Sequence, residues 1–114
     1  MKYFKRKEFV CKCGCGFDTV DYMLAIVLDD LRANFGVPIT ITSGCRCKKH
    51  NKNEGGSKNS QHISGKASDL KVKGVKPRKV FDYLDKKYPN KFGLGLYNNR
   101  IHIDVRNKKA RWRV

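Results

Sequence analysis

Ser60-Gln-His62-Ile-Ser-Gly65-Lys-Ala-Ser-Asp69 and, near the end, Ile101-His102-Ile-Asp104-Val-Arg106 are the stretches that decide the fold of this chain. His62 and Asp69 are seven residues apart, a spacing that does not stack on consecutive helical turns but suits a loop that leads into a strand. The second stretch alternates, so His102 and Asp104 lie on one face of a strand. Two strands of one sheet would bring Asp69 and His102 together.

Two imidazoles and a carboxylate in this arrangement suit a catalytic zinc. Such a zinc usually takes three protein ligands and leaves the fourth position to water. That water can become hydroxide near neutral pH, which attacks carbonyls. His62, Asp69 and His102 therefore predict a small zinc hydrolase. On spacing alone, the alternative that His62 is a polar loop residue and His102 a partly buried histidine stays open.

Length and composition predict one folded domain over residues 1–114. A chain of 114 residues buries one modest core, and hydrophobic residues at 39% with aromatics at 11% argue against disorder. No apolar run approaches about 18 residues, so no membrane span is expected. The basic start, Met1–Val10, is followed by no apolar segment, which disfavours a secretory signal peptide.

The net charge predicts an affinity for polyanions. Twenty-six Lys and Arg residues against 10 Asp and Glu residues give +16, and such a surface attracts nucleic acid, anionic wall polymers and anionic membranes alike. No aromatic-rich RNA-binding signature or zinc-finger helix accompanies the charge. A solvated basic surface with general affinity for anions is the plainest interpretation, and no specific nucleic-acid partner is expected.

Five cysteines stand at positions 11, 13, 15, 45 and 47. An odd count without a signal peptide argues against a full disulfide framework. Thiolates so closely spaced are candidates for a second, structural zinc, bound by Cys11, Cys13, Cys15 and Cys47. The spacing departs from the common C-x-x-C knuckle, so free or buried thiols and a disulfide stay open as alternatives.

Periodicity predicts an α+β fold with a small, mostly antiparallel sheet and flanking helices. Apolar spacing indicates a helix over 20–35, capped by Asp18 or Thr19 and ended by Gly36, and a second helix that begins over 76–84 with Pro77 at an early position. Alternation indicates strands over 38–43, 67–72, 91–97 and 100–105, the last two joined by an Asn98-Asn99 turn. Residues 1–18 are expected to form an irregular, Cys-rich arm, and residues 44–61 a long polar loop.

The pattern Ser60-x-His62-x-x-Gly65-x-Ala67-x-Asp69 followed by His102 resembles the zinc D-alanyl-D-alanine peptidase family, which includes vancomycin-resistance D,D-peptidases and phage endolysins and shares its fold with the Hedgehog signalling domain. Further motifs resemble its small bacterial and phage branch: Ile41-Thr-Ser43-Gly44-x-Arg46, Gly95-x-Tyr97, His102-x-Asp104-x-Arg106 and Arg111-Trp112. The resemblance covers about residues 7–113 and implies a Hedgehog/D,D-peptidase-like fold.

The resemblance implies a role for each matching position. His62, Asp69 and His102 match the zinc ligands. Arg46 matches the arginine that binds the substrate carboxylate or stabilises the oxyanion, and its permanently charged fork suits either task. Ser60 matches a residue that hydrogen-bonds substrate or a ligand, and Gln61 is a candidate beside it. The alternatives are a surface cation for Arg46 and ordinary loop polarity for the other two.

One position departs from the family pattern. Many members carry a Glu or Asp as general base three residues before the last zinc histidine, where this chain has Asn99. Asp104 is the nearest carboxylate, and it is expected either to act as the base or to support a zinc histidine from behind. His50 is a weaker candidate for polarising the substrate, and a surface histidine is the simpler interpretation.

Together these residues imply a zinc-dependent peptidase that cuts bacterial peptidoglycan, either as a D,D-carboxypeptidase or as an endopeptidase. The expected setting is a phage or prophage endolysin, monomeric, made in the cytoplasm and released to the wall, with its +16 charge drawn to wall anions. The rivals are a relative that binds the wall without catalysis, and a basic nucleic-acid-binding module with a structural zinc. Zinc binding without hydrolysis would identify the first; salt-sensitive DNA binding that survives His62→Ala would identify the second.

Overall fold

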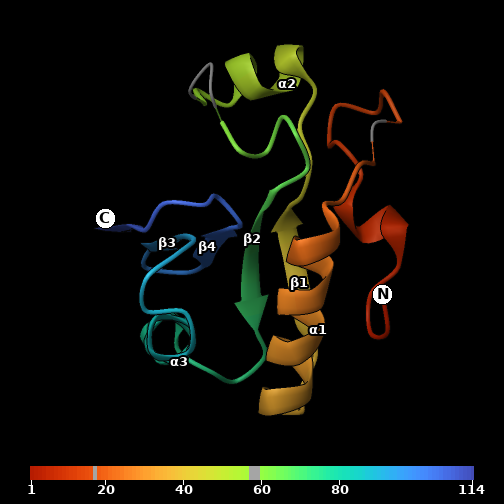
Figure 1. Cartoon of the computed structure of the whole chain (residues 1–114). Coiled ribbons are helices and arrows are strands. Elements are labelled where there is room, and N and C mark those ends of the chain that lie inside the picture. The colour runs from red at the N-terminus through yellow and green to blue at the C-terminus, as the bar shows by residue number, and fades with distance from the viewer. Residues whose placement is uncertain (17, 57–59) are drawn as a thin grey trace.

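Five strands form one sheet in the order β1-β2-β4-β3-β5 (Figure 1) in a computed structural model that describes residues 1–16, 18–56 and 60–114. The strands are β1 (Ile39–Ser43), β2 (Ala67–Val72), β3 (Gly93–Leu96), β4 (Ile101–Asp104) and β5 (Ala110–Arg113). The first four pair antiparallel, and β5 joins β3 in parallel. The predicted α+β fold with a mostly antiparallel sheet is confirmed.

Helix α1 (Tyr22–Phe35) begins two residues later than the sequence indicated. Its N-cap is Asp21, not Asp18 or Thr19. The Asp21 carboxylate accepts the backbone N–H of Met23 at 2.9 Å, and its own N–H binds the carbonyl of Gly65 at 2.9 Å, which holds the residue extended. The helix ends at Gly36, as predicted, in the left-handed conformation that glycine favours.

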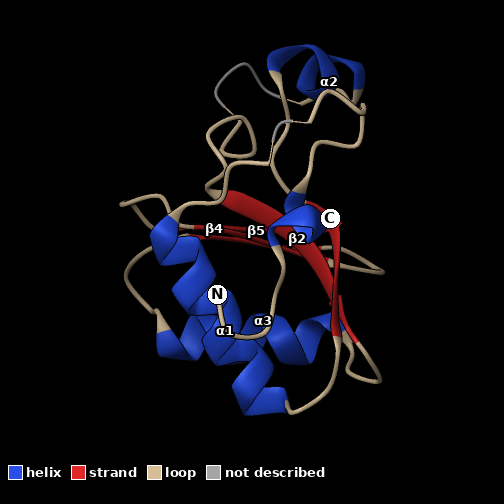
Figure 2. Cartoon of the chain, turned by 90° about the vertical axis from the view of Figure 1, so that its right-hand side faces the viewer, coloured by secondary structure: helices blue, strands red, loops and turns tan. Residues whose placement is uncertain are grey.

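Helices α1 and α3 (Pro77–Lys87) cover one face of the sheet, as Figure 2 shows. Pro77 stands in the first turn of α3, where its missing N–H costs nothing. Apolar side chains from both helices meet the strand residues that point toward them, among them Leu28, Leu31, Leu70, Val80, Leu84, Leu94, Ile101 and Ile103. This packing leaves the other face of the sheet for polar side chains.

Three elements were missed by the sequence patterns. A short helix, α2 (Lys48–Asn53), lies within the predicted loop, a 3-10 turn, η1 (Arg6–Phe9), lies within the arm, and β5 was not anticipated. α2 has no apolar period because only Asn51 of it is buried. β5 is defined by its pairing with β3, and periodicity does not report such pairing. Residue 17 of the predicted arm and residues 57–59 of the predicted loop lie outside the described residues.

The turn between β3 and β4 follows the prediction. The N–H of Tyr97 donates to the carbonyl of Arg100 at 3.1 Å, across Asn98 and Asn99. The hairpin brings β4 back along β3, so the side chains of His102 and Asp104 reach the polar face. Within the described residues, no helix is long and apolar enough to cross a membrane.

Candidate metal centre and cleft

The polar face of the sheet carries a row of four residues across four strands. Asp69 of β2 lies opposite His102 of β4, His102 lies opposite Gly95 of β3, and Gly95 lies beside Trp112 of β5. Gly95 is required here because a Cβ would collide with the indole of Trp112. The row therefore places a carboxylate and an imidazole side by side and covers the imidazole with an aromatic ring 5.1 Å away, centroid to centroid.

His62 reaches this row from the turn that precedes β2. Gly65 ends that turn with a positive φ of 70°, and a Cβ there would collide with the backbone of Thr19. The hydroxyl of Ser60 accepts the N–H of His62 at 3.2 Å, and the carbonyl of His62 accepts the N–H of Arg46 at 2.9 Å. Ser60 thus holds the backbone of the turn, and the turn is tied to the Arg46 segment.

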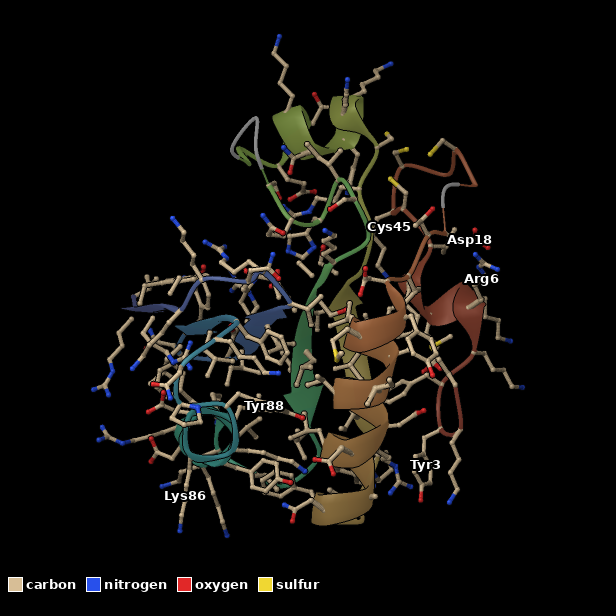
Figure 3. The ribbon with its side chains drawn as sticks, viewed as in Figure 1. Tyr3, Arg6, Asp18, Cys45, Lys86 and Tyr88 are labelled. Atoms are coloured by element: carbon tan, nitrogen blue, oxygen red, sulfur yellow. The ribbon has the colours of Figure 1, made fainter. Side chains whose placement is uncertain are left out.

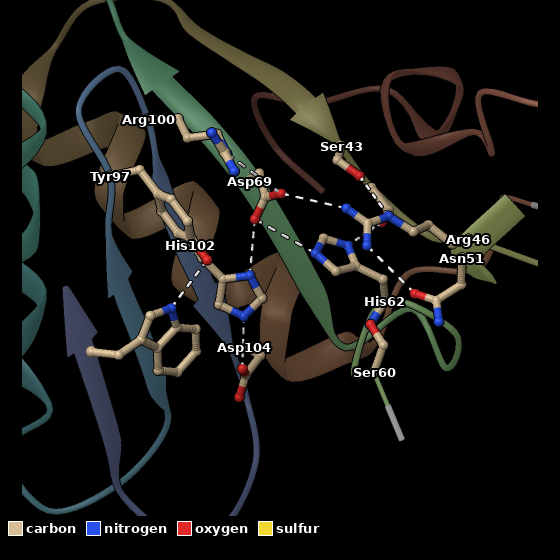
Figure 4. Close-up of polar contacts among 12 residues, drawn as sticks. Ser43, Arg46, Asn51, Ser60, His62, Asp69, Tyr97, Arg100, His102 and Asp104 are labelled. Carbon is tan, nitrogen blue, oxygen red and sulfur yellow. Dashed lines mark hydrogen bonds and ion pairs between the residues drawn. The ribbon is translucent and has the colours of Figure 1, made fainter. Parts of the chain in front are cut away.

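The three predicted ligands converge on one point (Figure 4). Nδ1 of His102 lies 2.8 Å from Oδ1 of Asp69, and Nε2 of His62 lies 3.5 Å from the same oxygen. One ligand atom from each residue lies within 4.8 Å of the other two, and all three residues are buried. Few polar groups are buried together in this way without a shared role.

In each imidazole, the ring nitrogen that does not face Asp69 is hydrogen-bonded to another residue. Nδ1 of His62 donates to the carbonyl of Gly44 at 2.6 Å, and since a carbonyl only accepts, Nε2 is left facing Asp69. Nε2 of His102 contacts Oδ2 of Asp104 at 2.8 Å, so Nδ1 is left facing Asp69. Metal-ligating histidines are typically oriented by such contacts. The donor set fits a divalent ion such as zinc.

Hydrogen bonds keep the carboxyl group of Asp69 ionised. Burial raises the pKa of Asp69, but its hydrogen bonds with His102 and His62 outweigh burial and hold the pKa well below its usual range. Burial lowers the pKa of His102, but hydrogen bonds to Asp104 and Asp69 outweigh it and raise the pKa. Asp69 is therefore ionised, and a cation that binds at the centre displaces the proton on Nδ1 of His102.

Asp104 lies behind His102, on the side of the ring away from Asp69. It is fully buried, and it also receives two charged hydrogen bonds from Arg106, from Nε to Oδ1 and from Nη2 to Oδ2, each at 2.7 Å. Burial raises its pKa, but the contacts with His102 and Arg106 bring it well below the usual range. Both oxygens are engaged, so of the two roles left open by the sequence this geometry matches support of the histidine.

Arg46 reaches the centre from the segment between β1 and α2. Its Nε donates to the hydroxyl of Ser43 at 3.2 Å, its Nη1 donates to Oδ1 of Asn51 at 3.4 Å, and its Nη2 lies 3.7 Å from Oδ2 of Asp69. The side chain is only 15% exposed. Held by Ser43 and Asn51, the guanidinium faces the candidate metal centre.

The three candidate ligands and Arg46 line one cleft of about 630 Å³. Ser60 and Gln61, both predicted, are among its walls. The cleft also includes residues for which the sequence assigned no role: Glu54, Tyr97, Arg100, Arg106 and Trp112. The indole N–H of Trp112 donates to the hydroxyl of Tyr97 at 3.1 Å, and the guanidinium of Arg100 lies 4.1 Å from the Tyr97 ring centre. The available signals for three of them, Tyr97, Arg106 and Trp112, were the motifs Gly95-x-Tyr97, His102-x-Asp104-x-Arg106 and Arg111-Trp112.

Two other candidates lie apart from the centre. His50 is on α2, and its Nε2 lies 3.7 Å from Oε1 of Glu54, outside the residues that line the cleft. Asn99 lines a separate, smaller cavity with Leu70, Val80 and other apolar residues. In the described structure, the side chain at position 99 therefore lies in a different cavity from the candidate ligands. The replacement of the family's Glu or Asp by Asn99 removes no carboxylate from beside them.

The fold and the centre agree with a match to a known family. A family model described as Peptidase M15 matches residues 2–104, which include the three candidate ligands and Asp104. No curated protein sequence matches the chain.

Proposed function

Because the chain belongs to the peptidase M15 family, a family of zinc-dependent D-alanyl-D-alanine peptidases, we propose that it hydrolyses peptide bonds of bacterial peptidoglycan at the centre formed by His62, Asp69 and His102. One observation carries the proposal. Two imidazoles and a carboxylate are buried at one end of an open cleft, each imidazole presents one nitrogen to the carboxylate, and each has its other nitrogen bound from behind.

Zinc at this centre would supply a Lewis acid for the scissile carbonyl and a water of lowered pKa. The chain supplies the rest. Gly44 and Asp104 fix the orientation of the two histidine rings. Arg46 places a permanent positive charge next to the centre, where it stabilises negative charge that develops on the carbonyl oxygen.

A carboxylate must take the proton of the attacking water, and Asp104 is badly placed for this task. Its oxygens contact His102 and Arg106 and are shielded from the cleft by the histidine ring. Among the described residues that line the cleft, Glu54 is the one carboxylate besides Asp69. It stands at the end of α2 and is more than half exposed. We assign the proton acceptor to Glu54 and the positioning of His102 to Asp104.

The substrate is a peptide that carries a carboxylate near the scissile bond. Three arginines line the cleft, namely Arg46, Arg100 and Arg106. Arg106 is neutralised by Asp104, whereas Arg46 and Arg100 both lie within 4 Å of the single carboxylate of Asp69. Their surplus positive charge suits the free carboxylates of peptidoglycan stem peptides.

Digestion of purified peptidoglycan, with fragments read by mass spectrometry, tests the proposal. We expect new peptide termini for the zinc-loaded wild type and none for His62→Ala, Asp69→Asn or chelator-treated wild type. Asp82→Asn is the matched control, because this carboxylate contacts only Arg78 on the exposed side of α3 in the described structure, and it should retain full activity. Zinc-loaded wild type that binds walls from several species but cuts none would leave a wall-binding relative and exclude the peptidase.

A matched pair of peptides separates the two modes of cleavage. An acyl-D-Ala-D-Ala peptide and its C-terminal amide differ only in the terminal charge. If the enzyme cleaves the acid peptide but not the amide peptide, it is a carboxypeptidase that binds the terminal carboxylate. Cleavage of intact stems at an internal bond indicates an endopeptidase. In either case, we propose that the enzyme acts as a phage endolysin and that its +16 charge concentrates it on anionic wall polymers.

A further inference from the structure

A second group of soft ligands lies beyond the cleft, where the N-terminal arm passes the start of α2. The side chains of Cys11, Cys13, Cys15 and Cys47 point toward one another, and their four sulfur atoms all lie within 4.8 Å of each other. Figure 3 shows sulfur atoms gathered in this region, near the labelled Cys45. We propose that these four thiolates hold a structural zinc ion, and that this ion fixes the segment that presents Arg46.

The spacing of the sulfurs matches a tetrahedral zinc site. Zinc–sulfur bonds of 2.3 Å in a tetrahedron place the sulfurs about 3.8 Å apart. The separations are 3.4 Å for Cys11–Cys13, 3.6 Å for Cys13–Cys47 and 3.8 Å for Cys11–Cys47. None of the five cysteines forms a disulfide in the described structure. Gly14, between Cys13 and Cys15, has a φ of +84°, a turn that glycine makes without strain.

Two backbone N–H groups point at sulfur atoms of the cluster. The N–H of Cys47 donates to the sulfur of Cys11, and the N–H of His50 donates to the sulfur of Cys47, each at 3.4 Å. Lys12, Lys48 and Lys49, neighbours of the ligands in sequence, offset the negative charge that four thiolates leave on a divalent ion.

The cluster is connected to Arg46 directly along the chain, because Arg46 stands between Cys45 and the proposed ligand Cys47. The N–H and the thiol of Cys45 both donate to the carbonyl of Phe9, each at 3.1 Å, and Gly44 packs so closely on the Phe9 backbone that a Cβ would collide with it. The N-terminal arm therefore binds the residue before Arg46 through Phe9, and the metal would bind the residue after it, Cys47. Together the two contacts would fix the backbone from which the Arg46 side chain extends.

Metal analysis of the purified full chain tests the site. We expect two zinc ions per wild-type chain, one at each centre. His62→Ala and the double variant Cys13→Ser/Cys15→Ser should each retain one. Cys45→Ser is the matched control, since a serine hydroxyl can still donate to Phe9, and it should retain both. With cobalt in place of zinc, a sulfur-to-cobalt charge-transfer band should persist in His62→Ala and vanish in the double variant.

A measurement on the wild type guards against a double variant that fails to fold. Cys13 and Cys15 are exposed, so free thiols there would react readily with iodoacetamide. The zinc-loaded chain should resist alkylation at both, and a chelator should remove the protection. Equal alkylation with and without chelator, a zinc content that the double variant leaves unchanged, or a mass two hydrogens lighter from a disulfide would each overturn the proposal.

The link to Arg46 rests on the proposed function and has its own readout. If the thiolate zinc positions Arg46, the double variant should lower the hydrolysis rate of the wild type but add no further loss to Arg46→Gln, while zinc at the histidine centre remains. An equal loss in both backgrounds would overturn the link. The metal content and the alkylation pattern do not depend on hydrolysis, so failure of the peptidase proposal would leave the thiolate site standing, and the reverse holds too.

Discussion

His102 lies directly opposite Asp69 on neighbouring antiparallel strands, and its Nδ1 is 2.8 Å from Oδ1 of Asp69. The pairing register therefore fixes two of the three candidate ligands, and only His62 depends on a turn. A shift of β4 by one residue would send His102 into the apolar core. The centre is thus as rigid as the sheet itself, which suits a site that must hold a metal without rearrangement.

Asp104→Asn should weaken zinc binding at the histidine centre by roughly 10- to 100-fold, the usual cost of losing a group that orients a ligating histidine. The reason is its hydrogen bond to Nε2 of His102 at 2.8 Å. Competition with a chromophoric chelator measures the affinity. If zinc affinity stays at the wild-type value while turnover falls, Asp104 acts on the substrate instead.

Glu54→Gln should lower kcat by about 10²-fold or more, with zinc content unchanged, because a general base contributes about that much. Glu54 lines the cleft without contacting the candidate ligands in any described interaction. Single-turnover rates of zinc-loaded protein measure the effect. A variant that keeps the wild-type rate would remove Glu54 from the mechanism.

Arg46→Gln should lower the hydrolysis rate by about 10²- to 10³-fold, as for the loss of a donor to a developing oxyanion. The guanidinium is aimed by Ser43 and Asn51, so Arg46→Lys should recover little of the loss, since an ammonium lacks the planar fork. Zinc content should be unchanged in both. Near-normal hydrolysis by the lysine variant would show that positive charge alone is needed.

Gly93→Ala should destabilise the fold by about 1–3 kcal/mol, because a Cβ would collide with the carboxylate of Asp104. Displacing that carboxylate should also weaken zinc binding. The double variant with Asp104→Asn tests the route: if Gly93 acts through Asp104, the two losses of zinc affinity will not add. Fully additive losses would contradict this coupling.

The contact between α1 and α3 should make stability depend on acidic pH. Oδ2 of Asp30 lies 2.6 Å from Nζ of Lys87 and accepts the Tyr83 hydroxyl at 2.9 Å. Burial raises the pKa of Asp30, but these bonds outweigh it and lower the pKa. Because the pKa of Asp30 is lower in the folded state, its ionised form stabilises the fold at pH values above the unfolded pKa of about 4. This stabilisation is lost as the pH falls through the lower, folded-state pKa.

Asp30→Asn should therefore cost about 0.5 kcal/mol near pH 7, a modest value because the ion pair is over a third exposed. The difference from wild type should shrink toward pH 3. Urea unfolding at the two pH values measures it, with Asp82→Asn as the control for removing one negative charge from the surface. A difference that is constant or larger at pH 3 would reverse the assigned sign.

The sequence alone determined which residues could serve as ligands and which strands carry two of them. Alternation in β2 and β4 placed Asp69, His102 and Asp104 on one face, because strand periodicity is local and each strand is flanked by clear turns. The motifs at Arg46 and His62 identified these two side chains, together with Ser60 and Gln61, but assigned no role to the other walls of the cleft, Glu54 among them. The helices α1 and α3 followed from apolar spacing, with errors confined to the start of α1.

Only the tertiary structure decided which partners those residues contact. The sequence left Asp104 open between two roles, and only the packing of His102 and Arg106 around it shows that both oxygens are engaged. β5, which brings Trp112 over His102, exists by virtue of its pairing with β3. Cys47 likewise lies beside Cys11, Cys13 and Cys15, which are more than 30 residues earlier in the sequence, only because the chain folds. Local patterns report a residue's own element, whereas partners distant in sequence are selected by the packing of the whole chain.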